Sequence, residues 1–398
     1  MRIFWKECKK ILDVRILLIL TVFTIFYYQL FMQITEYPCG GQCTDSLYDI
    51  PFCAELIEEL GPTLAVSDLA KIDRKQKELE EAYTKLIAED KILTEAGIND
   101  YAAFEQTEEE FFDKDELTED EKKISKELDR LIFTDEAGTK LYFEIQEINR
   151  IKDGKGISYG VSEREVQNYE SADMTEIVKK TRKNIITRDY ISLIPEGVFF
   201  ILQRDMTAMA MLLLICFAVL LIPYQVRERL RFVQPLYAST AVGRKIFLMQ
   251  FWSAIGACVL VGLVQFGVYL FIFIEKGLAV FWKCPCWDSV VNLLWCDGIS
   301  FGTYMFLYMV LVFIFTLAAV AIFYLAARVA TNYISGIAIA IPLCGGSGVL
   351  SYLLFHSLFL IRNTDRMPFT ELPWIGGWLI IAGVILWWRF WRDRRRDI

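Results

Sequence analysis

Residues 206–276 read MTAMAMLLLICFAVLLIPYQVRERLRFVQPLYASTAVGRKIFLMQFWSAIGACVLVGLVQFGVYLFIFIEK. Two long apolar runs flank a loop that carries five Arg and Lys residues, from Arg227 to Lys245. A helix of about 20 apolar residues crosses the roughly 30 Å hydrocarbon layer of a bilayer, and both runs are long enough to do so. The stretch therefore predicts a multispanning membrane protein with a basic loop between two of its helices.

Apolar runs of similar length occur elsewhere in the chain. Together they predict six crossings: Ile16–Ile34, Met206–Tyr224, Ile246–Ile274, Ile299–Ala327, Tyr333–Ile361 and Trp374–Phe390. The first run is long and aromatic, and Met32–Glu36 after it offers no small-residue cleavage site, so we expect an uncleaved anchor rather than a signal peptide. The predicted fold class is an all-α membrane protein with a large insertion after its first transmembrane helix.

The short connections carry an uneven distribution of basic residues. Four groups stand out: Arg2, Lys6, Lys9, Lys10 and Arg15; Arg227, Arg229, Arg231, Arg244 and Lys245; Arg328; and Arg392, Arg394, Arg395 and Arg396. Basic residues resist translocation, and with six crossings all four groups lie on one side of the bilayer. The sequence therefore predicts a multi-pass cell-membrane protein with both termini in the cytoplasm.

The insertion, residues 35–205, differs in composition from the rest of the chain. It holds roughly 40 Asp and Glu against about 22 Lys and Arg, so the remainder is basic although the net charge is −8. Helix signals dominate: Leu69–Ile92, a capping box at Thr118–Glu121, and a helix from Ser162 toward Arg188. We expect an acidic, mainly helical domain outside the cell. The negative electrostatic field of this domain could attract cationic peptides or drugs, although charged helix faces usually only keep a domain soluble. The same negative charge disfavours binding of nucleic acid.

Six cysteines fall on the outer side of this topology: Cys39, Cys43, Cys53, Cys284, Cys286 and Cys296. An even set in an oxidising compartment favours disulfides, whose connectivity the sequence does not give. The Cys284-Pro285-Cys286 pair resembles a metal or redox site only superficially, because the single histidine, His356, lies elsewhere and one intervening residue strains a mutual disulfide. We expect structural bridges, or unpaired thiols in an anaerobic organism.

Catalytic constellations are missing from the sequence. A single histidine leaves no His-Glu-x-x-His zinc site, and no Gly-x-x-x-x-Gly-Lys-Ser/Thr loop is present to cradle a nucleotide phosphate. We therefore predict no enzyme activity, cofactor or metal in this chain. Any ATP hydrolysis linked to it would come from another polypeptide.

The loop at residues 225–245 begins with an amphipathic pattern. Val226, Leu230 and Val233 recur at helical spacing between arginines, and Pro235 ends the pattern. One interpretation is a helix anchored on anionic lipid headgroups by its basic residues. The other is a docking helix for a cytosolic subunit.

The segment that follows favours docking. Leu236–Ile246, LYASTAVGRKI, with Glu228 before it, resembles the loop between the second and third helices of ABC type-2 exporter permeases. In that family an acidic residue ends the second helix and a Leu-x-Ser-Thr-Pro-x-Gly-Arg-like segment leads into the third; here Ala241 stands where proline is frequent. The resemblance implies a coupling helix that docks on an ATPase. The residues that it implicates are Glu228, Leu230, Val233, Ser239, Thr240, Gly243 and Arg244.

The architecture of residues 1–34 and 206–398 also resembles that family, whereas the insertion does not. Family members begin with an amphipathic connecting helix, for which residues 1–15 have suitable spacing of apolar side chains before the first transmembrane helix at 16–34. Asp205 resembles an acidic position common in members with large outer domains. By the same resemblance, Pro342, Gly345, Gly346 and Gly348 would break the fifth helix, and Ser351–Arg362 would form a re-entrant piece.

The resemblance implies a membrane-spanning permease subunit of an ATP-driven exporter. Its partners would be ABC ATPase subunits and a second permease, identical or homologous, and its substrate an antimicrobial peptide or another amphipathic compound. Two alternatives remain open. A mechanotransmission permease would use the outer domain to relay motion, and a membrane sensor would bind a ligand there and dock a signalling protein on the loop.

Overall fold

The computed structural model describes residues 2–36, 45–65, 68–112, 114, 116–154, 190–231, 243–286, 299–358 and 372–395. Within them, five helices are long and apolar enough to cross a membrane: α2 (Val14–Phe31), α12 (Glu196–Leu230), α14 (Gly243–Glu275), α15 (Phe301–Val329) and α16 (Tyr333–Leu358). Helix α17 (Leu372–Arg395) lies beside α15, and its apolar part, Ile375–Ile385, is shorter. The prediction of an all-α, multi-pass membrane protein is confirmed at this level.

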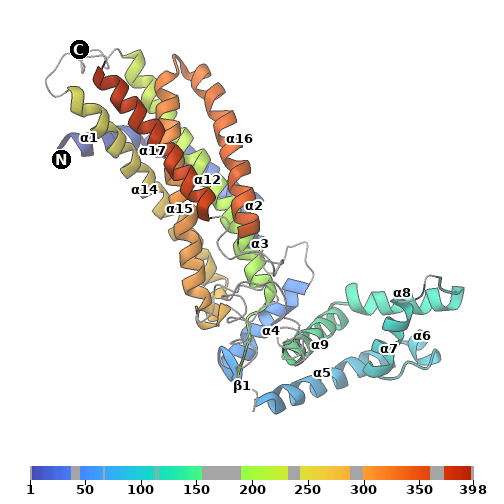
Figure 1. Ribbon diagram of the computed structural model, residues 1–398. Coiled ribbons are helices and arrows are strands. Elements are labelled where there is room, and N and C mark those ends of the chain that lie inside the picture. Colours follow the sequence, from blue (N-terminus) through green and yellow to red (C-terminus); the bar gives the residue numbers. More distant parts are fainter. Residues whose placement is uncertain are drawn as a thin grey trace, which may run out of the picture.

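The bundle is built around α12, which packs along both α15 and α16 (Figure 1). Its side chains point inward on most sides, with Leu213, Phe217 and Leu220 fully buried. Helix α16 approaches α12 closely because Gly348 lies against Met211, where a Cβ would come within 2.7 Å of the Met211 sulfur. Small residues at such contacts allow helices to pack tightly in a bilayer, where apolar side chains gain nothing from leaving lipid.

Two helices differ from the sequence prediction. Helix α12 begins at Glu196 rather than near Met206, and it continues unbroken to Leu230, so the predicted amphipathic pattern starts as the last turns of a membrane helix. Helix α16 runs without interruption through Pro342 and the three glycines after it. The predicted break of the fifth helix is therefore wrong, because neighbouring helices let a membrane helix tolerate proline and glycine.

The described part of the insertion between α2 and α12 is mainly helical, as its helix-forming and capping residues predict. It comprises α4 (Asp45–Leu60), α5 (Leu69–Glu89), α6 (Lys91–Glu95), α7 (Tyr101–Phe112), α8 (Glu119–Phe133) and α9 (Glu136–Gly154). Helices α5 to α9 form an elongated unit, here called the arm, which projects sideways from the end of the bundle opposite the two termini (Figure 1). The predicted helix from Ser162 toward Arg188 lies outside the described residues.

The root of the arm is joined to the bundle through α4 and a short sheet. Helix α4 packs on α9, on α12 and on η2 (Leu278–Lys283), the 3-10 helix that follows α14. Strands β1 (Thr63–Ala65) and β2 (Tyr190–Ser192) pair antiparallel, and β2 leads directly into α12. The hydroxyl of Ser192 donates to the carbonyl of Pro285, 3.0 Å away, in the connection between α14 and α15. These contacts place the start of α12 beside the root of the arm.

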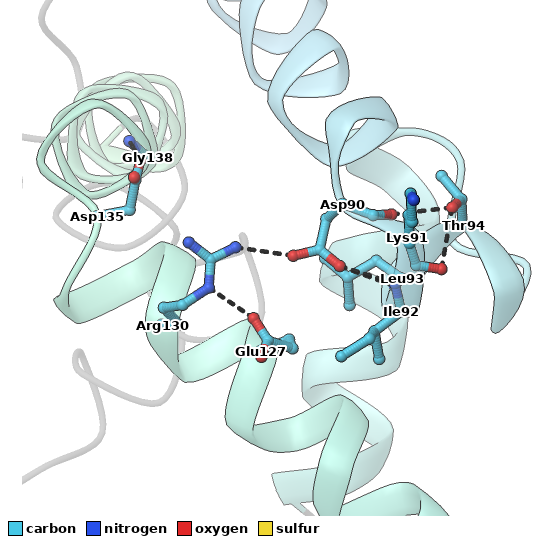
Figure 2. Close-up of polar contacts among 9 residues, drawn as sticks. All are labelled: Asp90, Lys91, Ile92, Leu93, Thr94, Glu127, Arg130, Asp135 and Gly138. Carbon is cyan, nitrogen blue, oxygen red and sulfur yellow. Dashed lines mark hydrogen bonds and ion pairs between the residues drawn. The ribbon is translucent and has the colours of Figure 1, made fainter.

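Local polar contacts fix the far end of the arm. The capping box at Thr118 and Glu121 is present, with the Thr118 N–H donating to Glu121 Oε2 at 2.8 Å. The predicted helix Leu69–Ile92 instead divides at Asp90, whose extended backbone and side chain cap α6 through the N–H groups of its first turn. Arg130 of α8 donates to the same carboxylate at 2.7 Å (Figure 2). Asp90 thus ends one helix, begins the next and ties α8 to both.

Candidate functional site

Four elements meet where α12 ends, at the end of the bundle that carries both termini (Figure 1). They are α1 (Arg2–Ile11), the first turn of α2, the last turns of α12, and the C-terminal end of α15. We call the polar contacts among them the basal junction. It is formed by Glu7, Lys10, Asp13, Tyr224, Arg227, Glu228 and Arg229. The chain leaves this junction as residues 232–242 before α14 begins.

Helix α1 is held against α14 by its apolar face. The ring of Phe4 lies over Gly256, where a Cβ would come within 2.9 Å of Phe4 Cζ, so only glycine permits this approach without displacement. The thiol of Cys8 donates to the carbonyl of Ser253 at 3.4 Å, and the Ser253 hydroxyl lies 3.2 Å from the Phe4 carbonyl and 2.7 Å from the Met249 carbonyl. The amphipathic pattern predicted for residues 1–15 is thus satisfied by packing on the bundle.

The polar face of α1 contacts α12 through two buried carboxylates. Tyr224 donates its hydroxyl proton to Glu7 Oε2 at 2.6 Å, and Lys10 Nζ lies 2.7 Å from Glu7 Oε1. The same ammonium group lies 3.5 Å from Glu228 Oε1. Lys10 therefore joins a carboxylate of its own helix to one on α12. Charges taken out of water need such partners, because an unpaired buried carboxylate is strongly disfavoured.

Arg227 makes a second link between α12 and the N-terminal segment. Its guanidinium donates to the Lys10 carbonyl at 2.7 Å and pairs with Asp13 at 3.1 Å. Asp13 also caps α2 by accepting from the Arg15 N–H. That N–H, and then Arg227, lower the pKa of Asp13 below its ordinary value. The turn between α1 and α2 is thereby fixed to the end of α12.

Arg229 links α12 to α15. Its Nη1 lies within hydrogen-bonding distance of three successive carbonyls at the end of α15: Arg328 at 3.2 Å, Val329 at 2.9 Å and Ala330 at 3.0 Å. The last carbonyls of a helix have no partner within the helix and carry its partial negative charge, so a guanidinium suits them well. At the end of α12, Arg227 and Glu228 therefore bind the N-terminal segment, and Arg229 binds the end of α15.

The structure places the predicted coupling residues in unequal settings. Glu228 is buried at the junction, whereas the side chain of Leu230 is half exposed at the last residue of α12. Val226 is fully buried inside the bundle, so it is not available as a docking anchor. Gly243 and Arg244 begin α14. Val233, Ser239 and Thr240 lie outside the described residues.

The predicted disulfide cysteines that are described have free thiols. Cys53 of α4 is buried and donates to Glu147 Oε1 of α9 at 3.0 Å. Cys284 and Cys286 are buried and unpaired near the root of the arm. Cys39, Cys43 and Cys296 lie outside the described residues, so the proposed bridges to them stay predictions.

Several junction residues could not be singled out from the sequence. Glu7, Lys10 and Asp13 look like ordinary charges of a basic N-terminus, and Tyr224 looks like one of many membrane aromatics. One signal was available: Glu7 and Lys10 are three residues apart on a predicted helix, so they occupy one face and can pair. Their contacts with α12 bridge more than 200 residues of chain and depend on the fold.

Another buried acidic residue lies in the N-terminal half of α12. Asp205 is fully buried, and its Oδ2 accepts from the N–H of Ile34 at 3.2 Å, where the chain leaves α2. Ionisable residues at membrane depth are costly and usually have a defined partner. Asp205 and the basal junction thus fix both halves of α12 to the N-terminal segment.

The basal junction joins the end of α12 to α1, to the turn between α1 and α2, and to α15. Among the described residues, no group of three or more His, Cys, Asp and Glu side chains is placed to hold a metal ion. Comparisons with protein-family models, with curated proteins and with solved structures found no match.

Proposed function

We propose that this chain is the membrane-spanning permease subunit of an ATP-driven ABC exporter, with ATP hydrolysed by a separate ATPase that docks on residues 225–245. The basal junction is the observation that carries the proposal. The segment that resembles a coupling loop emerges from a helix end bonded to α1, the α1–α2 turn and α15. A helix end that only led into a lipid anchor would not need bonds to three other elements.

In this mechanism, closure of the ATPase dimer displaces the loop, and the junction passes the movement to the bundle. Lys10 and Arg227 carry it to the N-terminal segment, and Arg229 carries it to α15. Helix α17 supplies the sixth crossing, both termini face the cytoplasm and the arm lies outside. A second permease, identical or homologous, completes the transporter, and the substrate is an antimicrobial peptide or another amphipathic compound.

Docking is tested by replacing the exposed apolar anchor. Leu230→Ser should reduce copurification of the candidate ABC ATPase, coexpressed with this chain, at least several-fold, because hot spots of docking surfaces include apolar side chains that become buried. Val14→Ser is the matched control, since Val14 is an exposed apolar residue at the same end of the bundle. Equal recovery of the ATPase with Leu230→Ser and with wild type would overturn the docking role of the loop.

Coupling is tested at Glu228. Glu228→Ala removes the partner of Lys10 on α12 while leaving Leu230 in place. The variant should retain the ATPase and its hydrolysis but lose transport into inverted vesicles. If hydrolysis and transport fall together, or neither falls, Glu228 does not transmit the movement.

The mechanotransmission permease is the second candidate, and the continuity of α12 favours it. One unbroken helix of 35 residues runs from β2, beside the root of the arm, to the basal junction. Such a helix can relay movement between the arm and the loop without a substrate path through the bundle. Reconstituted vesicles distinguish the two candidates: an exporter accumulates substrate in the lumen, whereas a mechanotransmission permease hydrolyses ATP in response to an arm ligand without accumulation.

A further inference from the structure

The middle of the arm holds two inward-facing carboxylates on α7. Glu105 and Glu108 are three residues apart and share one face of the helix, toward α9. Tyr142 of α9 donates to both oxygens of Glu108, at 2.9 and 3.0 Å, and Tyr101 lies 3.4 Å from Glu105 Oε1. Both glutamates are partly buried, whereas the next two acidic residues, Glu109 and Glu110, are exposed.

No basic side chain compensates these two charges within the described part of the chain. Among the described residues, neither Glu105 nor Glu108 forms an ion pair. Burial raises the pKa of both, and acidic side chains, among them Glu80, Glu109 and Asp129, raise these pKa values further. Other carboxylates of the arm have cationic partners, such as Glu121 with Lys114 and Asp90 with Arg130. Like charges gathered at a half-buried site destabilise the fold unless a cation or protons reach it.

A buried hydroxyl at the same place also lacks a partner. Tyr83 of α5 is fully buried, and its hydroxyl has no hydrogen-bond partner among the described residues. The Tyr83 ring lies 5.4 Å from the ring of Tyr101 and 6.4 Å from that of Tyr142, the two tyrosines whose hydroxyls contact Glu105 and Glu108. Buried polar groups are nearly always hydrogen-bonded, so an orphan hydroxyl beside two uncompensated carboxylates indicates a missing ligand group. This observation is independent of the acidic cluster itself.

The chemistry of the site suits an organic cation with N–H donors. Ammonium and guanidinium groups donate charge-assisted hydrogen bonds to carboxylates, and their remaining N–H can donate to the Tyr83 oxygen. The rings of Tyr101 and Tyr142 border the carboxylates and add an attraction for cations. We propose that Glu105, Glu108, Tyr83 and Tyr142 form a binding site for the ammonium or guanidinium group of a ligand outside the cell.

This site goes beyond the proposed function and does not depend on it. Binding to the arm requires neither an ATPase nor transport, so it can be measured on the full chain alone. If the chain binds the cation but no ATPase, this inference stands and the permease assignment fails. If it binds an ATPase but no cation, the permease assignment stands and this inference fails.

Binding is tested on the full chain in nanodiscs of uncharged phosphatidylcholine, by calorimetric titration at pH 7 with empty nanodiscs subtracted. The probes are N-acetyl-lysine methylamide, for a peptide side chain, and spermidine, for a free polyamine; N-acetyl-norleucine methylamide is the neutral control. We expect saturable binding of at least one cation and none of the neutral probe. Glu105→Gln/Glu108→Gln should weaken binding at least tenfold.

The matched control is Glu109→Gln/Glu110→Gln, which removes the same charge from the exposed side of α7 and should change binding less than twofold. Tyr83→Phe deletes only the hydroxyl and should weaken binding several-fold without altering the helical circular dichroism spectrum. This variant tests the site even if Glu105→Gln/Glu108→Gln folds poorly. Equal weakening by both glutamine pairs would mean a diffuse field rather than a site. Absence of saturable binding, or binding of Ca²⁺ in place of both organic cations, would also overturn the inference.

Discussion

At the scale of single residues, the carboxylates of the arm fall into two groups that respond to pH in opposite directions. Glu121 has hydrogen bonds from Lys114 and Thr118, which lower its pKa to about 2. Burial, then neighbouring carboxylates, raise the pKa of Glu105 above its ordinary value of 4.5, and burial does the same for Glu108. The second group binds protons in the folded state at pH values where the unfolded chain has already lost them.

This difference gives the arm a pH-dependent stability with a defined sign. Where the folded state holds more protons than the unfolded state, the free energy of unfolding falls as pH rises. For Glu105 and Glu108 the window extends from 4.5 up to their raised pKa values. Thermal unfolding of the full chain, followed by helical circular dichroism, should show the arm transition moving to lower temperature as pH rises through this window.

Glu105→Gln/Glu108→Gln should flatten that dependence, because neither side chain then titrates. Some slope will remain, since burial also raises the pKa of Glu144. Glu109→Gln/Glu110→Gln should keep most of the wild-type slope, because burial is the main cause of the raised pKa values of Glu105 and Glu108 and Glu109 is a lesser one. If the unfolding temperature depends on pH equally in the wild type and in both double variants, Glu105 and Glu108 are not the groups that titrate.

At the scale of elements, the attachment of α1 depends on one close approach. Replacing Gly256 by Leu places a side chain where the ring of Phe4 lies, and α1 must move away from α14. Cys8, which is 5% exposed, should then become reactive. In a variant with Cys8 as its only cysteine, Gly256→Leu should raise the rate of maleimide labelling in detergent at least several-fold.

Gly267→Leu is the control for this prediction. Gly267 lies on the same helix, and nothing within 4 Å would meet a Cβ there. It should leave the labelling rate of Cys8 unchanged. An unchanged rate in Gly256→Leu as well would mean that α1 is held by its polar contacts to α12 alone.

The elements that the sequence predicted are those whose determinants are local. The Thr118–Glu121 capping box needs only residues three apart, and the membrane helices need only sustained hydropathy. The start of α12 was missed because Arg204 and Asp205 interrupt the apolar run, while the helix before them is stabilised by distant packing: the Phe199 ring lies 5.3 Å from the Phe301 ring of α15.

The same distinction holds for the two candidate sites. Glu228 was identified through a resemblance, but its partner Lys10 could not be, since helix packing brings the two together. At the arm site, the acidic run at 108–110 was visible in the sequence. The division between inward Glu108 and outward Glu109 and Glu110 appears only when α9 and α5 are packed against α7.

At the scale of the whole molecule, the two termini lie together at one end of the bundle and the arm projects from the other (Figure 1). This placement fits an even number of crossings, with α17 as the sixth in the proposed topology. The basic residues near the termini predict that their end faces the cytoplasm.

Single cysteines at two exposed positions test this orientation. In intact cells an impermeant maleimide should label Glu110→Cys on the arm but not Lys9→Cys on α1, in a background without other cysteines. Both should react after the cells are permeabilised, which controls for accessibility of the side chain itself. Labelling of position 9 in intact cells would invert the orientation and remove the proposed coupling loop from the cytoplasm.

Helix α12 also fixes how the protein fits its membrane. Between Asp205 and Arg227 it carries no charged residue over about 21 positions, a length of roughly 32 Å at 1.5 Å per residue. Asp205 is bonded to Ile34, and Arg227 to Asp13 and Lys10, so neither end can slide or snorkel freely. The usual responses to hydrophobic mismatch, tilting one helix or shifting its ends, are therefore restricted. Instead, a thinner or thicker bilayer must deform around the protein. A change in the acyl-chain length of the surrounding lipid then strains the hydrogen bonds and ion pairs of the basal junction.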